Sequence, residues 1–184
     1  MLEGFLIPLL VVGLAELGDK TQLSILCLSS KTKKNMELLF GVVLAFAVAD
    51  GLAIVFGDFI ARVLPLDYIK VGAGIVFIVF GIMTFMSLSK EESGETGNIR
   101  NPFLSAFGLV LISEMGDKTQ IASGLFATQY NPYLVFAGVM TALVALSLMA
   151  IYIGKILVGR IDKRKLSIAA GTIFVVIGII TIFQ

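Results

Sequence analysis

Residues 16–22 read Glu-Leu-Gly-Asp-Lys-Thr-Gln, and residues 114–120 read Glu-Met-Gly-Asp-Lys-Thr-Gln. The two motifs agree at six of seven positions and lie ninety-eight residues apart. Each places two carboxylates and a lysine inside an apolar run long enough to cross a bilayer, where one charge costs at least ~2.5 kcal/mol. We infer that these charges serve a function and that the chain presents the same element twice.

The composition of the chain is that of a membrane protein. Of 184 residues, 58% are hydrophobic and 15% charged, and the mean hydropathy is +1.00, whereas soluble domains are ~45–50% apolar and ~25% charged. The net charge of +1 gives no reason to expect nucleic acid as a partner, and the absence of histidine leaves a metal site to oxygen ligands. The single Cys27 lies in an apolar run, so we expect it to be a small buried side chain.

Six segments have the roughly 20 mostly apolar residues that a membrane span requires. The sequence therefore predicts an all-α membrane protein of six transmembrane helices, in residues 5–29, 38–57, 68–88, 102–128, 133–154 and 166–183. A polar stretch divides the chain into a first three-helix repeat at 1–89, a linker at 90–101 and a second three-helix repeat at 102–184.

The two halves correspond beyond the motifs, since five residues of the third span recur ninety-seven positions later in the sixth: Gly74, Phe77, Gly81, Ile82 and Thr84 match Gly171, Phe174, Gly178, Ile179 and Thr181. We expect the glycine rows, which also include Gly72, to form helix-packing surfaces. Three spans per half make the second half enter the membrane from the opposite side, as an inverted repeat.

Basic residues give the orientation. The loops after the first, third and fifth spans hold ten Lys and Arg residues, whereas the opposite face holds only Arg62 and Lys70. By the positive-inside rule, the three basic loops, including the central one, are cytoplasmic and both termini lie outside.

The acids and oxygens of the two motifs predict one site for a metal cation. Residues three apart share a helix face, so we expect Glu16 and Asp19 to point the same way. The glycine inside each pair, Gly18 or Gly116, either lets the backbone unwind or lets another helix approach closely. Corresponding helices of inverted repeats meet near the midplane. The predicted metal-binding residues are Glu16, Asp19, Thr21, Gln22, Glu114, Asp117, Thr119 and Gln120.

Carboxylate, hydroxyl and amide oxygens are hard ligands, which favour Ca²⁺, Mn²⁺ and Mg²⁺ over thiophilic ions. The four carboxylates and two lysines of the motifs sum to a charge of minus two, which matches one divalent cation. Crowded carboxylates retain protons when no metal is bound, so metal binding releases protons. A site open alternately to each side would therefore exchange a cation for protons.

Three further charged residues support this site. Lys20 and Lys118 either neutralise an acid across the interface or move onto a carboxylate when the metal leaves. Asp50 is the one charge inside the second span, and its counterpart in the fifth is Ser147. It acts either as a proton relay or extra ligand, or as a structural group that makes an interhelical hydrogen bond or pairs with a lysine.

The doubled Glu-x-Gly-Asp-Lys-Thr motif, in the first and fourth of six predicted spans, resembles the transmembrane protein 165, or GDT, family of cation:proton exchangers. That family includes the bacterial manganese exporters called MneA. The resemblance implies a secondary antiporter that moves Mn²⁺ or Ca²⁺ out of the cytosol and is not an enzyme. The short central loop and the absence of a targeting segment favour a prokaryotic cell membrane. The resemblance settles neither the ion nor whether the chain forms a homo-oligomer.

Other classes of protein remain to be weighed. An intramembrane aspartyl protease carries Gly-x-Gly-Asp, but Glu16 and Glu114 stand where its first glycine belongs. A passive divalent-cation channel would need the same acids along a pore, and proton dependence of the flux distinguishes it from a carrier. A membrane scaffold without transport activity would tolerate neutral residues in the motifs.

Overall fold

The computed structural model describes residues 2–86, 101–153 and 163–183. Within this part of the chain every regular element is helical, which confirms the predicted all-α class. Most of the predicted linker 90–101 and of the basic loop 155–165 lies outside the described residues, as do residues 87, 88 and 154 of two predicted spans. The elements are α1 (Glu3–Glu16), α2 (Lys20–Ser30), α3 (Asn35–Val63), α4 (Leu66–Met86), α5 (Pro102–Glu114), α6 (Lys118–Gln129), α7 (Pro132–Leu148), the π-helix η2 (Met149–Ile153) and α9 (Lys163–Phe183).

Within the described ranges, two helical stretches are long and apolar enough to cross a membrane on length and composition: Asn35–Val63, and Pro132–Tyr152, in which η2 continues α7. The segments predicted as the first and fourth spans each consist of two shorter helices, α1 with α2 and α5 with α6. Both breaks fall inside a motif. The apolar runs are therefore present as expected, but the motifs interrupt them.

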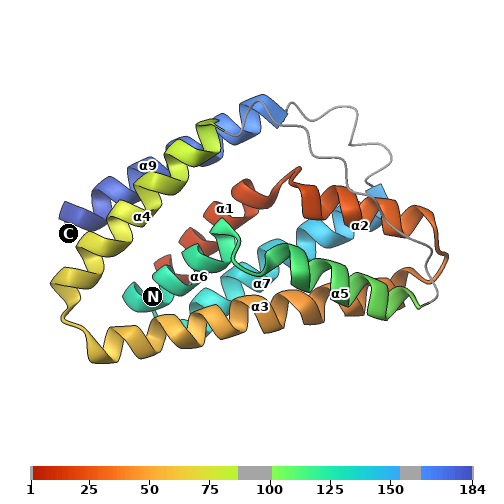
Figure 1. Cartoon of the computed structure of the whole chain (residues 1–184), viewed down its shortest axis with the longest axis horizontal. Coiled ribbons are helices and arrows are strands. Elements are labelled where there is room, and N and C mark those ends of the chain that lie inside the picture. The colour runs from red at the N-terminus through yellow and green to blue at the C-terminus, as the bar shows by residue number, and fades with distance from the viewer. Residues whose placement is uncertain (1, 87–100, 154–162, 184) are drawn as a thin grey trace.

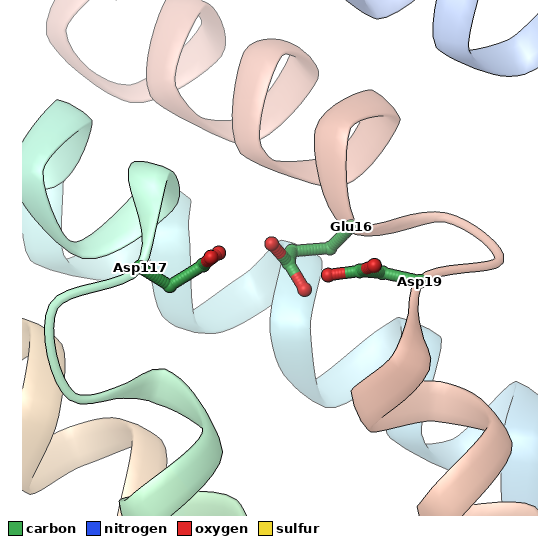
Figure 2. A group of neighbouring side chains, drawn as sticks. All are labelled: Glu16, Asp19 and Asp117. Carbon is green, nitrogen blue, oxygen red and sulfur yellow. The ribbon is translucent and has the colours of Figure 1, made fainter. Parts of the chain in front are cut away.

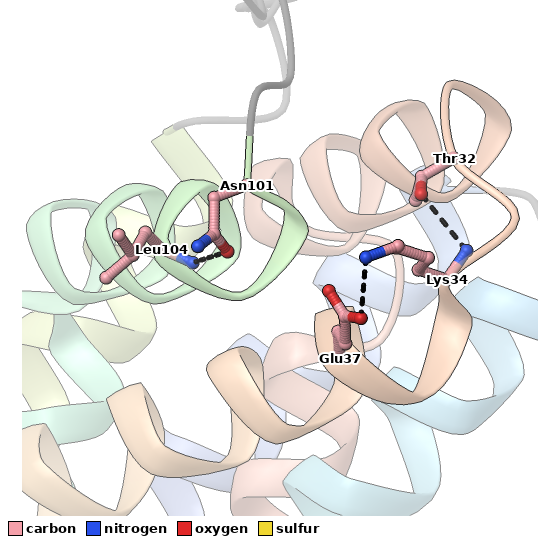
Figure 3. A network of polar contacts seen from close by, with 5 residues as sticks. All are labelled: Thr32, Lys34, Glu37, Asn101 and Leu104. Carbon is pink, nitrogen blue, oxygen red and sulfur yellow. Dashed lines mark hydrogen bonds and ion pairs between the residues drawn. The ribbon is translucent and has the colours of Figure 1, made fainter.

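Polar side-chain contacts lie at the start of α5 and around the start of α3 (Figure 3). The Asn101 side chain accepts a hydrogen bond from the Leu104 N–H at 3.2 Å, which caps the start of α5. In the turn between α2 and α3, the Thr32 hydroxyl accepts from the Lys34 N–H at 3.0 Å. The Lys34 ammonium pairs with Glu37 at 2.8 Å in the first turn of α3. The Asn101 contact satisfies a backbone donor that the start of α5 leaves free.

Helices of the first half pack against helices of the second half. α1 packs along α7, and α3 packs along α5. α4 packs along α9, and this last pair forms one edge of the molecule (Figure 1). A Cβ added at Gly41 would collide with the carbonyl oxygen of Phe103, and one added at Gly138 would collide with that of Phe5. These two pairs occupy corresponding positions in the halves, so the α3–α5 and α1–α7 contacts are alike.

The glycine rows of α4 and α9 lie against each other. A Cβ at Gly74 would meet the Gly178 carbonyl oxygen, and one at Gly81 would meet that of Gly171. The predicted helix-packing surface is confirmed for these four glycines. At Gly72 an added Cβ would meet nothing within 4 Å.

The core joins helices around three buried aromatic rings, while apolar side chains cover the outside. Phe77 of α4 packs against Phe126 of α6 and Phe174 of α9, with ring centroids 5.1 and 6.1 Å apart. Phe56 on the outer face of α3 is 67% exposed, and many other large apolar side chains are exposed as well. Large exposed apolar surfaces are rare on soluble monomers and suit contact with lipid. Cys27 is also exposed, so its predicted burial is wrong.

Candidate cation site

Each motif folds into a tight turn between two helices. α1 ends at Glu16, and Leu17 then adopts φ −65° and ψ 112°. Gly18 has φ +81°, and the Asp19 N–H donates to the Glu16 carbonyl oxygen at 3.1 Å. These are the features of a type II β-turn, whose third residue needs a positive φ and is therefore usually glycine. Asp19 follows as the extended residue directly before α2.

The second motif repeats this turn closely. Met115 has φ −60° and ψ 111°, Gly116 has φ +80°, and the Asp117 N–H donates to the Glu114 carbonyl oxygen at 3.0 Å. An added Cβ at Gly116 would meet nothing within 4 Å. Of the two roles predicted for this glycine, the structure selects unwinding of the helix and not close helix approach.

The helix-face argument for the two acids of each motif is wrong, because the helix ends between them. Glu16 is the last residue of α1, and Asp19 lies beyond the turn. The turn nevertheless brings their carboxylates close to one another.

Three carboxylates from the two motifs form one group. One oxygen each of Glu16, Asp19 and Asp117 lie within 4.8 Å of one another (Figure 2). Oxygens bound to one Ca²⁺ at ~2.3–2.6 Å lie at most about 5 Å apart, so this spacing suits a shared cation. Two of the acids come from the first motif and one from the second, so neither motif makes the group alone.

The buried acid Glu16 has an unsatisfied oxygen. Its side chain is 1% exposed, and its Oε1 atom is buried without a hydrogen-bond partner. A buried acceptor without a partner costs free energy, and either a cation or a proton would satisfy it. The donor set and this free oxygen therefore fit a hard cation.

Glu114, the fourth acid, has a partner from the other motif. It is 3% exposed, and its Oε1 accepts a hydrogen bond from the Thr21 hydroxyl at 2.8 Å. The corresponding Thr119 hydroxyl instead donates to Asp117 Oδ2, within its own motif, at 3.3 Å. Both threonine hydroxyls thus orient carboxylates in this structure.

The glutamines at the ends of the motifs stabilise the turns. Gln22 Oε1 accepts from the Gly18 N–H at 3.1 Å, and Gln120 Oε1 accepts from the Gly116 N–H at 2.7 Å. The two oxygens predicted as metal ligands therefore bind backbone donors of the turn. The sequence analysis missed this role, although the four-residue spacing from glycine to glutamine was a visible signal.

The lysine of the second motif lies among these acids. Lys118 is half-buried and interacts electrostatically with acids of both motifs, among them most strongly with Asp19. The side chain of Lys20 lies outside the described part of the chain. Asp50 does not belong to the three-carboxylate group; it lies on α3, where the Ser123 hydroxyl of α6 donates to its Oδ1 at 2.8 Å.

Comparison with known proteins identifies relatives over nearly the whole chain. Residues 4–92 and 102–184 match the family model described as divalent cation/proton antiporter GDT1. A Vibrio cholerae protein named "Putative manganese exporter" is 30% identical over 181 residues, covering 96% of this chain and 89% of that protein. The divalent cation/proton antiporter GDT1 of Saccharomyces cerevisiae is 24% identical over 237 residues. That match covers 100% of this chain and 84% of the yeast protein. No solved structure matches.

Proposed function

The chain belongs to the GDT1 family of divalent cation/proton antiporters, and on that premise we propose that it exports Mn²⁺ or Ca²⁺ from the cytosol in exchange for protons. Both motifs contribute to one acidic site. The family consists of transporters and not enzymes, so the protease alternative is excluded. A Vibrio relative whose name describes manganese export favours Mn²⁺ as the first ion to test.

The observation that carries the proposal is the three-carboxylate group drawn from both motifs. Glu16, Asp19 and Asp117 bring oxygens to within 4.8 Å, close enough for one hard cation. Glu114 and Thr21 extend the site across the two motifs. Oxygen ligands of this kind favour Mn²⁺ and Ca²⁺ over thiophilic ions.

Proton exchange follows from the same groups. Carboxylates this close together repel one another when all are ionised, so they hold protons in the absence of metal. A cation that binds them takes the place of those protons. The Oε1 atom of Glu16 is buried without a hydrogen-bond partner, so it is open to a cation or a proton.

The proposed architecture is two inverted three-helix repeats with six spans in a prokaryotic cell membrane. The matched contacts of Gly41 with Phe103 and of Gly138 with Phe5 support it, because a two-fold relation between the halves would produce such pairs. The basic loops support cytoplasmic placement of the central segment, with both termini outside.

A flux assay on the full-length protein in liposomes that contain a pH dye tests the proposal. Mn²⁺, Ca²⁺, Mg²⁺ and Cd²⁺ are offered in turn, and cation uptake is recorded together with internal pH. We expect Mn²⁺ or Ca²⁺ to move protons in the opposite direction, with Cd²⁺ the weakest because it is soft. Cation flux without proton movement would instead identify a channel.

A pair of variants tests the role of the site. Asp117→Asn should abolish exchange, whereas Asp58→Asn should preserve it, because Asp58 pairs with Arg62 at 2.8 Å on the surface, away from the motifs. Full activity of a folded, monodisperse Asp117→Asn protein would contradict the shared site and favour a membrane scaffold.

A further inference from the structure

Asp50 is a buried acid that only the first half of the chain possesses. It lies in the middle of α3 and is 2% exposed. The corresponding residue of the second half, Ser147, is 1% exposed and donates to the carbonyl oxygen of Leu143 in its own helix at 2.6 Å. The three-carboxylate group is drawn from the two motifs and does not include Asp50, so Asp50 requires a separate explanation.

The Ser123 hydroxyl lies between Asp50 and the second motif. Its oxygen is 2.8 Å from Asp50 Oδ1 and 2.9 Å from the carbonyl oxygen of Thr119. A hydroxyl has one hydrogen, so it satisfies one of these two acceptors at a time. When Asp50 is ionised, the hydroxyl donates to it. When Asp50 is protonated, Asp50 donates to Ser123, and the Ser123 hydrogen turns to Thr119.

This switch acts directly on the first turn of α6. Thr119 donates through its own hydroxyl to Asp117, a member of the three-carboxylate group. The next residue, Gln120, donates to the Ala49 carbonyl oxygen at 3.0 Å, adjacent to Asp50, and accepts from Gly116 in the turn. The part of α3 around Asp50 is therefore linked by hydrogen bonds to Gly116 in the second turn and to the start of α6.

The charges around Asp50 couple its protonation to the binding of the cation. Asp117, directly before α6, and Glu114, the last residue of α5, both interact electrostatically with it. The one charge of α6, on Lys118, interacts with the acids of both motifs. α7, which also packs against α3, has no charged residue. The one charge of α2, on Lys20, belongs to a side chain outside the described part. Negative neighbours favour the protonated acid, and a cation that neutralises them favours the ionised one.

We propose that Asp50 is a proton-binding positioning residue, which takes up a proton from the facing solution when the cation leaves and returns it when a cation binds. Through Ser123, its protonation state sets the hydrogen bonding of the first turn of α6 and so the placement of Asp117. The inference rests on the proposed antiport, and it assigns part of the proton coupling to a residue outside the three-carboxylate group.

The test is Mn²⁺ binding to the purified full-length protein, measured by calorimetry in buffers of different ionisation enthalpy, which gives the protons released per Mn²⁺ bound. We expect Asp50→Asn to bind Mn²⁺ while it releases fewer protons. The dissociation constant for Mn²⁺ should also depend less on pH in Asp50→Asn than in the unaltered protein. For each proton no longer released, its change per pH unit should be about tenfold smaller. Ser147→Ala, the matched control, should keep the proton count and pH profile of the unaltered protein.

Asp50→Ser provides a second variant, since serine is the residue that the other half buries at this position. Unaltered proton release in folded Asp50→Asn or Asp50→Ser protein would overturn the role of Asp50 while leaving the antiport proposal intact. Failure of the unaltered protein to bind Mn²⁺ and, in a parallel titration, Ca²⁺, or to release protons when it binds either ion, would overturn both. Loss of Mn²⁺ binding in both variants would overturn the positioning role in favour of direct ligation.

Discussion

α2 and α6 begin with the same turn and nearly the same residues, but they pack in different surroundings. α6 lies along α3 (Figure 1), where an added Cβ at Gly57 would collide with the carbonyl oxygen of Gly124. Ser123 bonds Asp50 on the same interface, and Phe126 contacts Phe77 of α4. The second motif is therefore followed by a helix that is held along much of its length.

Among the described residues, the helix after the first motif contacts η2 and α5 in place of one long helix. Ser29 and Ser30, near the end of α2, donate to carbonyl oxygens of their own helix. Together with Asn35 and Tyr152 they border a cavity of about 490 Å³. The same motif thus gives the same local turn twice, while the packing of the following helix differs.

The variants with the largest expected effect test whether the two halves contribute equally to function. Glu16→Gln and Glu114→Gln should each lower Mn²⁺-driven proton movement in liposomes by about 100-fold or more, since even supporting groups at metal sites are worth 10–100-fold. Unaltered rates in either folded variant would mean that one half suffices. Glu37→Gln, which removes a surface ion pair with Lys34, is the control.

Gly57→Ala tests the close contact between α3 and α6. The new methyl group collides with backbone, so we expect the free energy of unfolding to fall by about 1–3 kcal/mol, the usual cost of overpacking. Gly72→Ala, in open space on α4, should have no destabilising effect. Thermal unfolding in detergent measures both, and equal melting temperatures would show that the α3–α6 contact is loose.

Alanine at the turn glycines tests the similarity of the two motifs. Gly18→Ala and Gly116→Ala each force a side chain into positive φ, which costs about 1–2 kcal/mol. We expect similar losses in unfolding free energy because the strain is local. A large loss at one position and none at the other would mean that the surroundings, and not the turn, decide the conformation.

The smallest effect distinguishes the two glutamines. Gln120→Ala removes hydrogen bonds to Gly116 and Ala49, whereas Gln22→Ala removes one to Gly18. At about 1 kcal/mol per hydrogen bond, the first variant should lose roughly twice as much unfolding free energy. Equal losses, measured by the same thermal assay, would show that the bond to α3 adds nothing.

Much of the fold was predictable because it depends on local pattern. Apolar runs long enough to span a membrane predicted helices, and the described residues are helical throughout those runs outside the two motifs. Gly18 and Gly116 raised the option of an unwound backbone, which the positive φ angles confirm. The continuous helix face expected for Glu16 and Asp19 was wrong, because helical spacing applies only while the helix continues.

The sequence by itself determined the family and the helical class, because both follow from motif and apolar pattern along the chain, and it offered an unwound backbone at Gly18 and Gly116 as one of two options. Only the tertiary structure decided that Glu16, Asp19 and Asp117 meet while Glu114 bonds Thr21. It also decided that Asp50 contacts Ser123. Such contacts depend on how helices distant in the sequence pack, and no local pattern specifies which atoms that packing brings together.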